Sequence, residues 1–223
     1  MPFSTLSLSS ELIHALPKDF KKPTDIQALA IPELLSGKDV LALANTGSGK
    51  TLAYGLPLLE KLSVNPEQKA LILVPTRELA TQVSEAINQV GQSIGLNAVC
   101  LCGGVDKEAQ LQALASNPHI LVATTGRLVD LANNGLELSS IHYLVLDEAD
   151  RLLDMGFWPD VQSIAGKIPN QRQTAMFSAT FSDELKGQAK QLMHAPKQLA
   201  AHQENSTNQD IAETLYLVNK GSK

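Results

Sequence analysis

A series of short apolar runs, separated by longer amphipathic or polar segments, constrains the fold of this chain most strongly. The runs occupy residues 39–44, 69–75, 97–102, 119–125, 142–147, 173–180 and 196–201. They are rich in Leu, Val, Ile and Ala and do not alternate strictly with polar residues, which is typical of strands covered on both faces. Each of the first six is followed by a segment with helical periodicity. The sequence therefore predicts an α/β fold with a doubly wound, mostly parallel sheet of about seven strands and helices on both faces.

The segments outside the predicted sheet divide the chain into three parts. Residues 1–38 contain two predicted helices, at 9–18 and 24–37, the second with Thr24 as N-cap and Gly37 as its end. Residues 39–201 form the predicted sheet domain. Residues 202–210 lack large apolar side chains and are typical of a linker, and the strand-like run at 211–218 is expected to begin a second folding unit.

Composition and charge narrow the classes of protein that the chain can represent. Apolar residues make up 43% and charged residues 18% of the 223 residues, which is enough apolar material for a buried core. No run of about 18 uncharged apolar residues and no secretory leader is apparent, so we expect a cytoplasmic protein without a membrane partner. Cys100 and Cys102 fit free thiols in a reducing compartment. The net charge of −5 disfavours long-range capture of a polyanion, so any nucleic-acid contact should be local.

The segment ANTGSGKT, residues 44–51, has the composition of a phosphate-binding loop. It lies between a predicted strand and a predicted helix, where glycines let backbone N–H groups surround phosphate oxygens at a helix N-terminus. The loop departs from the strict pattern because Ala44 stands where the first glycine belongs. Lys50 would reach the β- and γ-phosphates, Thr51 would ligate Mg²⁺, and the nucleotide-binding residues of the loop would be Thr46, Gly47, Ser48, Gly49, Lys50 and Thr51.

Acidic residues follow the predicted strand at 142–147 without an interval, in the sequence Asp147-Glu148-Ala149-Asp150. The carboxyl end of a parallel strand is where ligands bind in such sheets. Asp147 would hold Mg²⁺, largely through water, and Glu148 would orient the attacking water and accept its proton, so Lys50, Asp147 and Glu148 are the candidate catalytic residues. A solvated acidic helix cap after a core strand is the alternative interpretation.

Seven short motifs occur in a fixed order along the chain. They lie at 20–27 (FKKPTDIQ), 44–51 (ANTGSGKT), 75–80 (PTRELA), 103–104 (GG), 124–127 (TTGR), 147–150 (DEAD) and 178–180 (SAT). In these motifs the chain resembles the DEAD-box family of ATP-dependent RNA helicases, from Phe3 to Phe181. The resemblance implies the N-terminal RecA-like lobe of a P-loop NTPase that uses ATP and Mg²⁺, with residues 1–38 as part of that lobe.

The resemblance also assigns the adenine site. The amide of Gln27 would pair with the N6 and N7 edge of adenine, since it offers one donor and one acceptor, a pairing that guanine cannot satisfy. Phe20 belongs to the same motif, and Phe3 would pack on the base. For Phe3, a core aromatic near the N-terminus is the alternative interpretation.

The RNA contacts implied by the resemblance lie in three further motifs and go to the RNA backbone, without sequence preference. The residues are Pro75, Thr76, Arg77, Gly103, Gly104, Thr124, Gly126 and Arg127. An ordinary surface ion pair is the alternative for each arginine. Aromatic residues are only 4% of the chain, which disfavours a base-stacking platform. Asp150, Ser178 and Thr180 would couple the state of the nucleotide to RNA binding through hydrogen bonds between them.

Four positions depart from the usual family pattern: Asp19, where Gly is common, Asp25, where Pro is common, Asn45, where Gln is usual, and Thr125, where Pro is usual. None removes a catalytic group, although Thr125 is expected to loosen the turn before Arg127. The resemblance implies a second RecA-like lobe of the same protein, which supplies arginines to the γ-phosphate. The chain alone is therefore expected to be monomeric, to bind nucleotide and to be nearly inactive as an ATPase. A nucleotide-gated RNA clamp without productive unwinding is the alternative function.

Overall fold

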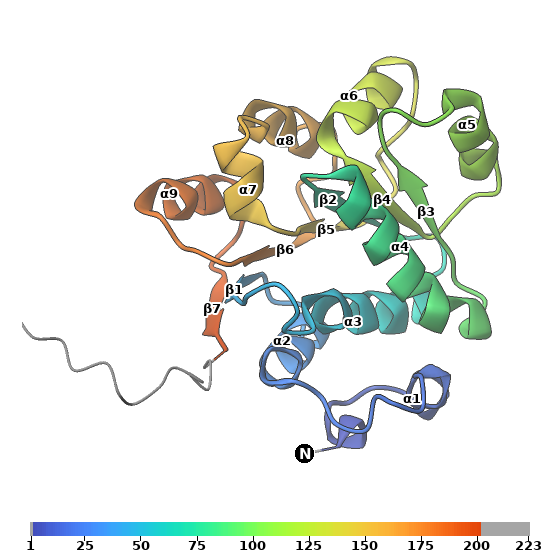
Figure 1. The fold of residues 1–223 in the computed structure, drawn as a ribbon, viewed down its shortest axis with the longest axis vertical. Coiled ribbons are helices and arrows are strands. Elements are labelled where there is room, and N and C mark those ends of the chain that lie inside the picture. The colour runs from blue at the N-terminus through green and yellow to red at the C-terminus, as the bar shows by residue number, and fades with distance from the viewer. Residues whose placement is uncertain (1, 202–223) are drawn as a thin grey trace, which may run out of the picture.

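The computed structural model describes residues 2–201, which form one twisted seven-stranded sheet with helices on both sides (Figure 1). Every recorded strand pairing is parallel, and the strand order is β3-β4-β2-β5-β6-β1-β7. The strands are β1 Val40–Leu43, β2 Lys69–Val74, β3 Ala98–Leu101, β4 Ile120–Thr124, β5 Ile141–Leu146, β6 Gln173–Ser178 and β7 Lys197–Ala200. The α/β fold and its seven predicted strands are confirmed, and the sheet is parallel throughout rather than mostly parallel.

Alternate residues of strands β1 to β6 enter two separate apolar cores. In β1, Val40 and Ala42 belong to one core and Leu41 to the other, which is why the strands read as continuous apolar runs. Helices α2, α3 and α4 lie on one side of the sheet and α6 to α9 on the other (Figure 1). The helices are α1 Ser10–Ala15, α2 Asp25–Leu35, α3 Lys50–Val64, α4 Arg77–Gly91, α5 Lys107–Ala115, α6 Thr125–Asn133, α7 Ala149–Asp154, α8 Trp158–Ala165 and α9 Asp183–Leu192.

The two predicted N-terminal helices are present. Helix α1 ends before the predicted boundary because Pro17 disfavours helical geometry at Leu16, whose ψ is 139°. Helix α2 begins with a capping box in which Thr24 and Gln27 satisfy each other's backbone amides. Gly37 follows its end with φ of +86°, a conformation that favours glycine. Short 3₁₀ turns occupy Phe3–Thr5 and Gln92–Ile94.

Asp39 fixes the strand that leads into the phosphate loop. Its Oδ1 accepts a hydrogen bond from the backbone amide of Thr174 at 2.8 Å, and its Oδ2 accepts one from the amide of His194 at 2.6 Å. Its backbone carbonyl also accepts from the amide of Lys197 at 2.8 Å. Asp39 is only 7% exposed, so these bonds join β1 to its two neighbours, β6 and β7, inside the protein.

The parallel sheet brings the carboxyl ends of five strands to one edge. The segments that follow β1, β2, β4, β5 and β6 are the predicted phosphate loop, residues 75–77, residues 124–127, the acidic pair and the SAT segment. No helix within residues 2–201 is both long and apolar enough to cross a membrane. The predicted linker at 202–210 and the strand-like run at 211–218 lie outside the described residues.

Candidate functional site

The phosphate loop connects β1 to α3 and is shaped by two glycines with positive φ. Gly47 and Gly49 have φ of +82° and +89°, and α3 begins directly afterwards at Lys50. The hydroxyl and backbone amide of Ser48 both donate to the carbonyl of Asn45, at 2.7 and 3.2 Å. Gly49, the N-cap of α3, provides no side-chain cap, so the loop and the first turn of α3 can offer their N–H groups to phosphate oxygens.

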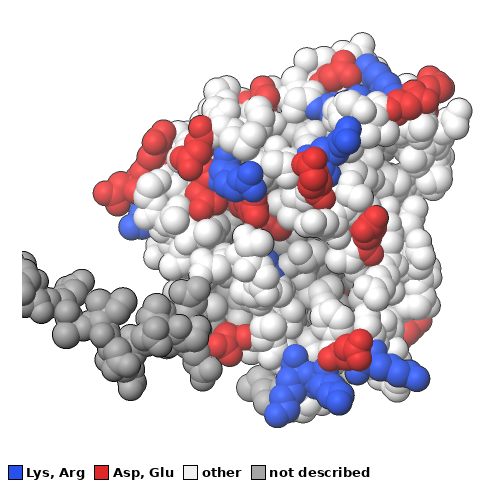
Figure 2. Space-filling view, in the orientation of Figure 1, with Lys and Arg blue, Asp and Glu red and all other residues white. Residues whose placement is uncertain are grey.

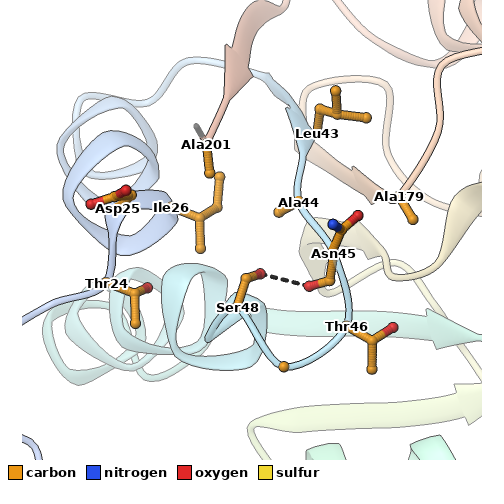
Figure 3. Close-up of a pocket in the computed structure, with 11 residues that line it drawn as sticks. Thr24, Asp25, Ile26, Leu43, Ala44, Asn45, Thr46, Ser48, Ala179 and Ala201 are labelled. Atoms are coloured by element: carbon orange, nitrogen blue, oxygen red, sulfur yellow. Dashed lines mark hydrogen bonds between the residues drawn. The ribbon is translucent and has the colours of Figure 1, made fainter. Parts of the chain in front are cut away.

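A cavity of about 560 Å³ lies beside this loop (Figure 3). It is bounded by the start of α2, the phosphate loop and the ends of β6 and β7, and its lining residues include Thr24, Asn45, Ser48, Ala179 and Ala201. Asn45, one of the four departures named above, lies in this lining. Its amide is shorter than that of the usual glutamine but still reaches the surface of the loop. A volume in this range is typical of small-molecule sites.

Lys50 lies buried opposite the acidic pair. Its Nζ is 3.7 Å from Oδ1 of Asp147, and the side chains are 7% and 2% exposed. Within residues 2–201 the buried Nζ has no hydrogen-bond partner. Burial raises the pKa of the Asp147 carboxyl, while Lys50 and the hydroxyl of Tyr54 act in the opposite direction. A buried ammonium that makes no hydrogen bond, beside a buried carboxylate, fits an anion and a divalent cation together, as a Mg²⁺-bound triphosphate would supply.

Tyr54 is a site residue that the sequence analysis missed. Its buried hydroxyl donates to Oδ2 of Asp147 at 2.7 Å, and burial together with this carboxylate raises its pKa well above the ordinary value. The other carboxylate oxygen, Oδ1, accepts from the backbone amide of Glu148 at 2.9 Å. Tyr54 lies four residues after Lys50 in α3, so a search for polar groups one helical turn from Lys50 would have found it.

Glu148 has an uncommon backbone conformation, with φ of +52°. A left-handed conformation at a non-glycine residue carries a cost of about 1–3 kcal/mol and is frequent at functional sites. Its Oε2 accepts from Nη1 of Arg151 at 2.8 Å, and its Oε1 accepts from the hydroxyl of Thr46 at 3.4 Å. The carboxylate of Glu148 thus lies beside the phosphate loop, where a general base for hydrolysis would be required.

The predicted adenine residues occupy two different environments. Gln27 is buried, with Oε1 accepting from the amide of Thr24 at 3.0 Å and Nε2 donating to the carbonyl of Gly49 at 3.1 Å. Both amide atoms therefore have an internal partner, and each keeps one further hydrogen-bonding valence. A smaller cavity of about 200 Å³ beside Gln27 is lined by Phe20 and Gly49 but not by Phe3. Phe3 is 4% exposed and belongs to the core, the alternative left open by the sequence, while Phe20 is 40% exposed.

Asp150, Ser178 and Thr180 are hydrogen-bonded to one another as predicted. Oδ2 of Asp150 accepts from the amide and from the hydroxyl of Thr180, each at 3.0 Å. The hydroxyl of Ser178 accepts from the amide of Asp150 at 3.2 Å and donates to the carbonyl of Thr180 at 2.8 Å. These contacts join the ends of β5 and β6, so movement of one strand end would be transmitted to the other.

The predicted RNA residues lie at the starts of α4 and α6 and in the turn after β3. Thr76 caps α4, and Nη1 of Arg77 donates to the carbonyl of Gly104 at 3.3 Å. Arg127 donates from Nη2 to the carbonyl of Val105 at 3.2 Å. The structure thus places both arginines against the Gly103-Gly104 turn. Pro75 directly follows the last residue of β2, and Thr124 and Gly126 flank the first residue of α6.

Thr125, where the family has Pro, lies two residues before Arg127. It is 2% exposed and is the first residue of α6, with Thr124 as the N-cap in an extended conformation. The first helical position favours proline because its N–H needs no intrahelical partner, and threonine is accommodated there as well. Thr125 is thus accommodated as the first helical residue, and the loosening of this turn stays a prediction.

Cations and anions are interspersed on the described surface shown in Figure 2, without a continuous basic stripe across that face. This distribution agrees with the net charge of −5 and with local rather than long-range contacts to a polyanion. Cys100 and Cys102 are free thiols whose sulfur atoms are 3.8 Å apart. In the described part of the chain, no cluster of three or more His, Cys, Asp and Glu has the geometry of a metal site.

A phosphate loop after β1 and an acidic pair after β5, at one edge of a parallel sheet, define a RecA-like P-loop nucleotide-binding domain. A family model described as DEAD/DEAH box helicase matches residues 24–187. The chain belongs to this family, and the resemblance seen in its sequence motifs is confirmed.

Named relatives agree with this assignment. The ATP-dependent rRNA helicase RRP3 of Meyerozyma guilliermondii is 43% identical over 99% of this chain and 47% of its own length. The ATP-dependent RNA helicase DeaD of Escherichia coli is 44% identical over 97% of this chain and 35% of its own length. The crystal structure of a DEAD box protein from Methanococcus jannaschii is 38% identical, with a TM-score of 0.84, over 91% of this chain and 56% of that one. The chain thus spans half or less of the length of these curated relatives.

Proposed function

We propose that the chain is the N-terminal ATP-binding lobe of an ATP-dependent RNA helicase, which couples ATP binding and hydrolysis to RNA remodelling or local duplex unwinding. The observation that carries this proposal is the buried ammonium of Lys50, which lacks a hydrogen-bond partner within residues 2–201 and lies 3.7 Å from Asp147. A buried ammonium without a hydrogen bond is costly, and a phosphate placed in the loop would accept hydrogen bonds from it. The relatives named as ATP-dependent RNA helicases support the same assignment.

In the proposed reaction, Lys50 binds the β- and γ-phosphates, and the loop from Thr46 to Gly49 binds phosphate oxygens through backbone N–H groups. Thr51 and Asp147 would hold Mg²⁺, which neutralises phosphate charge when bound. Glu148 orients the attacking water and accepts its proton. Its Oε2 is paired with the exposed Arg151, so we expect Oε1, which lies 3.4 Å from the hydroxyl of Thr46, to accept the proton.

Adenine is proposed to bind beside Gln27 and Phe20. The free valences of the Gln27 amide, one N–H and one lone pair, match the donor and acceptor of the adenine N6 and N7 edge. Stacking of Phe3 on the base stays a prediction, and from its burial we expect Phe3 to support the pocket from the core. Binding would couple directly to the phosphate loop because Gln27 donates to the carbonyl of Gly49.

The RNA backbone is proposed to lie along the turn at 103–104 and the starts of α4 and α6, without sequence preference. Arg77 and Arg127 suit phosphate because the guanidinium presents several donors in one plane. Asp150, Ser178 and Thr180 would couple this surface to the nucleotide, since Asp150 directly follows the catalytic pair and bonds to the end of β6.

A second RecA-like lobe is proposed to complete both sites, in agreement with relatives about twice as long as this chain. An arginine supplied from such a lobe typically contributes about 10³–10⁵ in rate. We therefore expect the 223-residue chain alone to be monomeric, to bind Mg²⁺-ATP and to hydrolyse it very slowly.

Calorimetry of the chain with Mg²⁺-ATP and an RNA-stimulated ATPase assay of the full-length protein test this proposal. Lys50→Ala should abolish nucleotide binding, and Glu148→Gln should retain binding but lose turnover, while Lys186→Ala, which removes a half-exposed cation, serves as control. Unchanged RNA-stimulated turnover in either site variant would refute the assigned roles. The clamp and the helicase differ in the full-length protein. If the protein with ATP holds duplex RNA but does not separate its strands, the clamp is favoured over the helicase.

A further inference from the structure

Helix α5 contains a buried glutamine that belongs to none of the sequence motifs. Gln110 is 5% exposed and is the only buried residue in this helix of nine residues. Burial of an uncharged amide is unfavourable unless its donor and acceptor are both satisfied. The position of Gln110 therefore depends on specific polar partners rather than on apolar packing.

The partners of Gln110 come from two separate segments of the candidate RNA surface. Its Nε2 donates to the carbonyl of Cys102 at 2.9 Å, and its Oε1 accepts from Nη1 of Arg127 at 2.8 Å. Cys102 directly precedes the Gly103-Gly104 turn, and Arg127 lies in the first turn of α6. One buried side chain thus joins the turn after β3 to the start of α6.

Three carbonyl groups around this turn accept hydrogen bonds from side chains. The carbonyl of Cys102 accepts from Gln110, that of Gly104 from Arg77, and that of Val105 from Arg127. A Cβ at Gly104, whose φ is +74°, would lie 3.0 Å from Nη1 of Arg77, so the turn and this guanidinium are in close contact. Both arginines are therefore oriented by the turn, and Gln110 fixes the strand end from which the turn starts.

The orientation of Arg127 matters because a free arginine side chain loses about 2 kcal/mol of rotamer entropy when it is fixed. Two of its five N–H donors bind Gln110 and Val105, which leaves three for a phosphate. An arginine that is already fixed in the free protein loses less freedom when it binds RNA, which favours affinity.

We propose that Gln110 is a positioning residue for the RNA surface, which acts through Arg127 and the Gly103-Gly104 turn on the phosphodiester backbone. This inference rests on the proposed RNA binding by the same surface. Gln110 itself need not contact RNA, because its amide is buried and engaged on both atoms.

The test measures the affinity of the full-length protein for a fluorescein-labelled polyuridylate by anisotropy, with a slowly hydrolysed ATP analogue present. Gln110→Met, of similar size but without the amide, should weaken RNA binding by about 5–20-fold, which corresponds to about 1–1.8 kcal/mol and lies within the rotamer entropy of an arginine side chain, about 2 kcal/mol. Gln112→Met changes an exposed residue of the same helix and should bind RNA like the unmodified protein. The affinity for Mg²⁺-ATP should be unchanged in both variants.

Epistasis with Arg127 separates positioning from general damage to the fold. If Gln110 acts through Arg127, Gln110→Met should weaken RNA binding by less than about twofold when Arg127 is already replaced by Ala. If the two residues were independent, the losses in binding free energy would add. The slope of log affinity against log salt should fall by about 0.7 in Arg127→Ala, where one phosphate contact is lost, and by less in Gln110→Met, which keeps the guanidinium. A full additional loss in the double variant would overturn the inference.

Two further outcomes distinguish this inference from the proposed function. If Gln110→Met and Gln112→Met bind RNA equally well and Arg127→Ala binds weakly, the role of Gln110 is rejected but the RNA surface is not. Unchanged affinity in Arg127→Ala would reject the RNA surface itself. If Gln110→Met does not fold, Arg127→Lys keeps the charge at a surface position but loses the paired contacts to Gln110 and Val105. An RNA affinity of Arg127→Lys equal to that of the unmodified protein would then overturn the inference.

Discussion

Replacement of Tyr54 by Phe isolates one hydrogen bond at the candidate catalytic centre. The variant lacks only the hydroxyl that donates to Oδ2 of Asp147 at 2.7 Å. The ring stays in place because it is buried and packs edge-on against Phe177, with centroids 5.2 Å apart. Any change in stability should therefore report on the bond to Asp147 rather than on packing.

The magnitude follows from the environment of the carboxylate. A hydrogen bond to a charged group typically contributes about 1.5–3 kcal/mol, and removal of one buried partner leaves the other without compensation. Asp147 keeps the amide of Glu148 at 2.9 Å and the ammonium of Lys50 at 3.7 Å. Because these partners remain, we expect the lower part of the range, a loss of about 1.5–2 kcal/mol in the free energy of unfolding at pH 7.

The loss should depend on pH in a defined direction. Burial raises the pKa of Asp147 above its ordinary value of 3.8, against the opposing effects of Lys50 and Tyr54. Without the Tyr54 hydroxyl this pKa rises further. When the pKa of a carboxyl is higher in the folded than in the unfolded state, the free energy of unfolding falls as the pH rises from 3.8 through the folded-state pKa. The loss of stability is complete only at pH values above the folded-state pKa. The effect of Tyr54→Phe should thus be largest at pH 7 and shrink toward pH 4.

Urea denaturation followed by circular dichroism at pH 7 and pH 4.5 measures this difference. Tyr143→Phe is the matched control, because its hydroxyl donates to the uncharged amide oxygen of Gln68 at 2.7 Å. That variant should lose about 0.5–1.5 kcal/mol with little dependence on pH. The reasoning would be refuted if Tyr54→Phe had the same free energy of unfolding as the unmodified protein at pH 7. It would also be refuted if the loss were identical at both pH values.

Three further changes give expected outcomes that can be measured directly. Gly49→Ala should weaken Mg²⁺-ATP binding in calorimetry by at least about tenfold, because its Cβ would lie 2.6 Å from Nε2 of Gln27 at a φ of +89°, whereas Gly47→Ala has no such neighbour and adds only backbone strain. Asp39→Ala should lower the free energy of unfolding by about 2–4 kcal/mol in thermal denaturation, since two backbone amides lose a charged acceptor. Burial raises the pKa of Cys100 to about 11, so its alkylation by iodoacetamide, followed by mass spectrometry, should be slow at pH 8 and accelerate toward pH 11.

The architecture could be predicted from the sequence because its signals are local. Strand β5 reads as an apolar run that ends in Asp147, and the carboxyl ends of parallel strands share one edge of the sheet. The phosphate loop has its own pattern of glycines between a strand and a helix. The same logic predicted the contacts of Asp150 with Thr180, since both follow strand ends at that edge.

The contacts that the sequence did not reveal are made by residues that belong to none of the sequence motifs, Tyr54 and Gln110. Tyr54 and Asp147 are separated by 93 positions, and Gln110 and Arg127 by 17. A buried tyrosine or glutamine looks like many others in a sequence until its partner is placed in space. For Phe3, burial in the core depends on how the N-terminal segment packs on the helices near it, which no local pattern specifies.

Unfavourable features of the lobe converge on one side of the sheet edge, and this arrangement implies a function in binding. The ammonium of Lys50 is buried without a hydrogen bond to residues 2–201. The side chain of Asp147 is buried, which raises its pKa, and Glu148 has a left-handed backbone conformation. An anion alone would relieve Lys50 but oppose Asp147, and a cation alone would do the reverse. A ligand that carries phosphate and a divalent cation together relieves both, so its binding should stabilise the folded lobe more than either ion can separately.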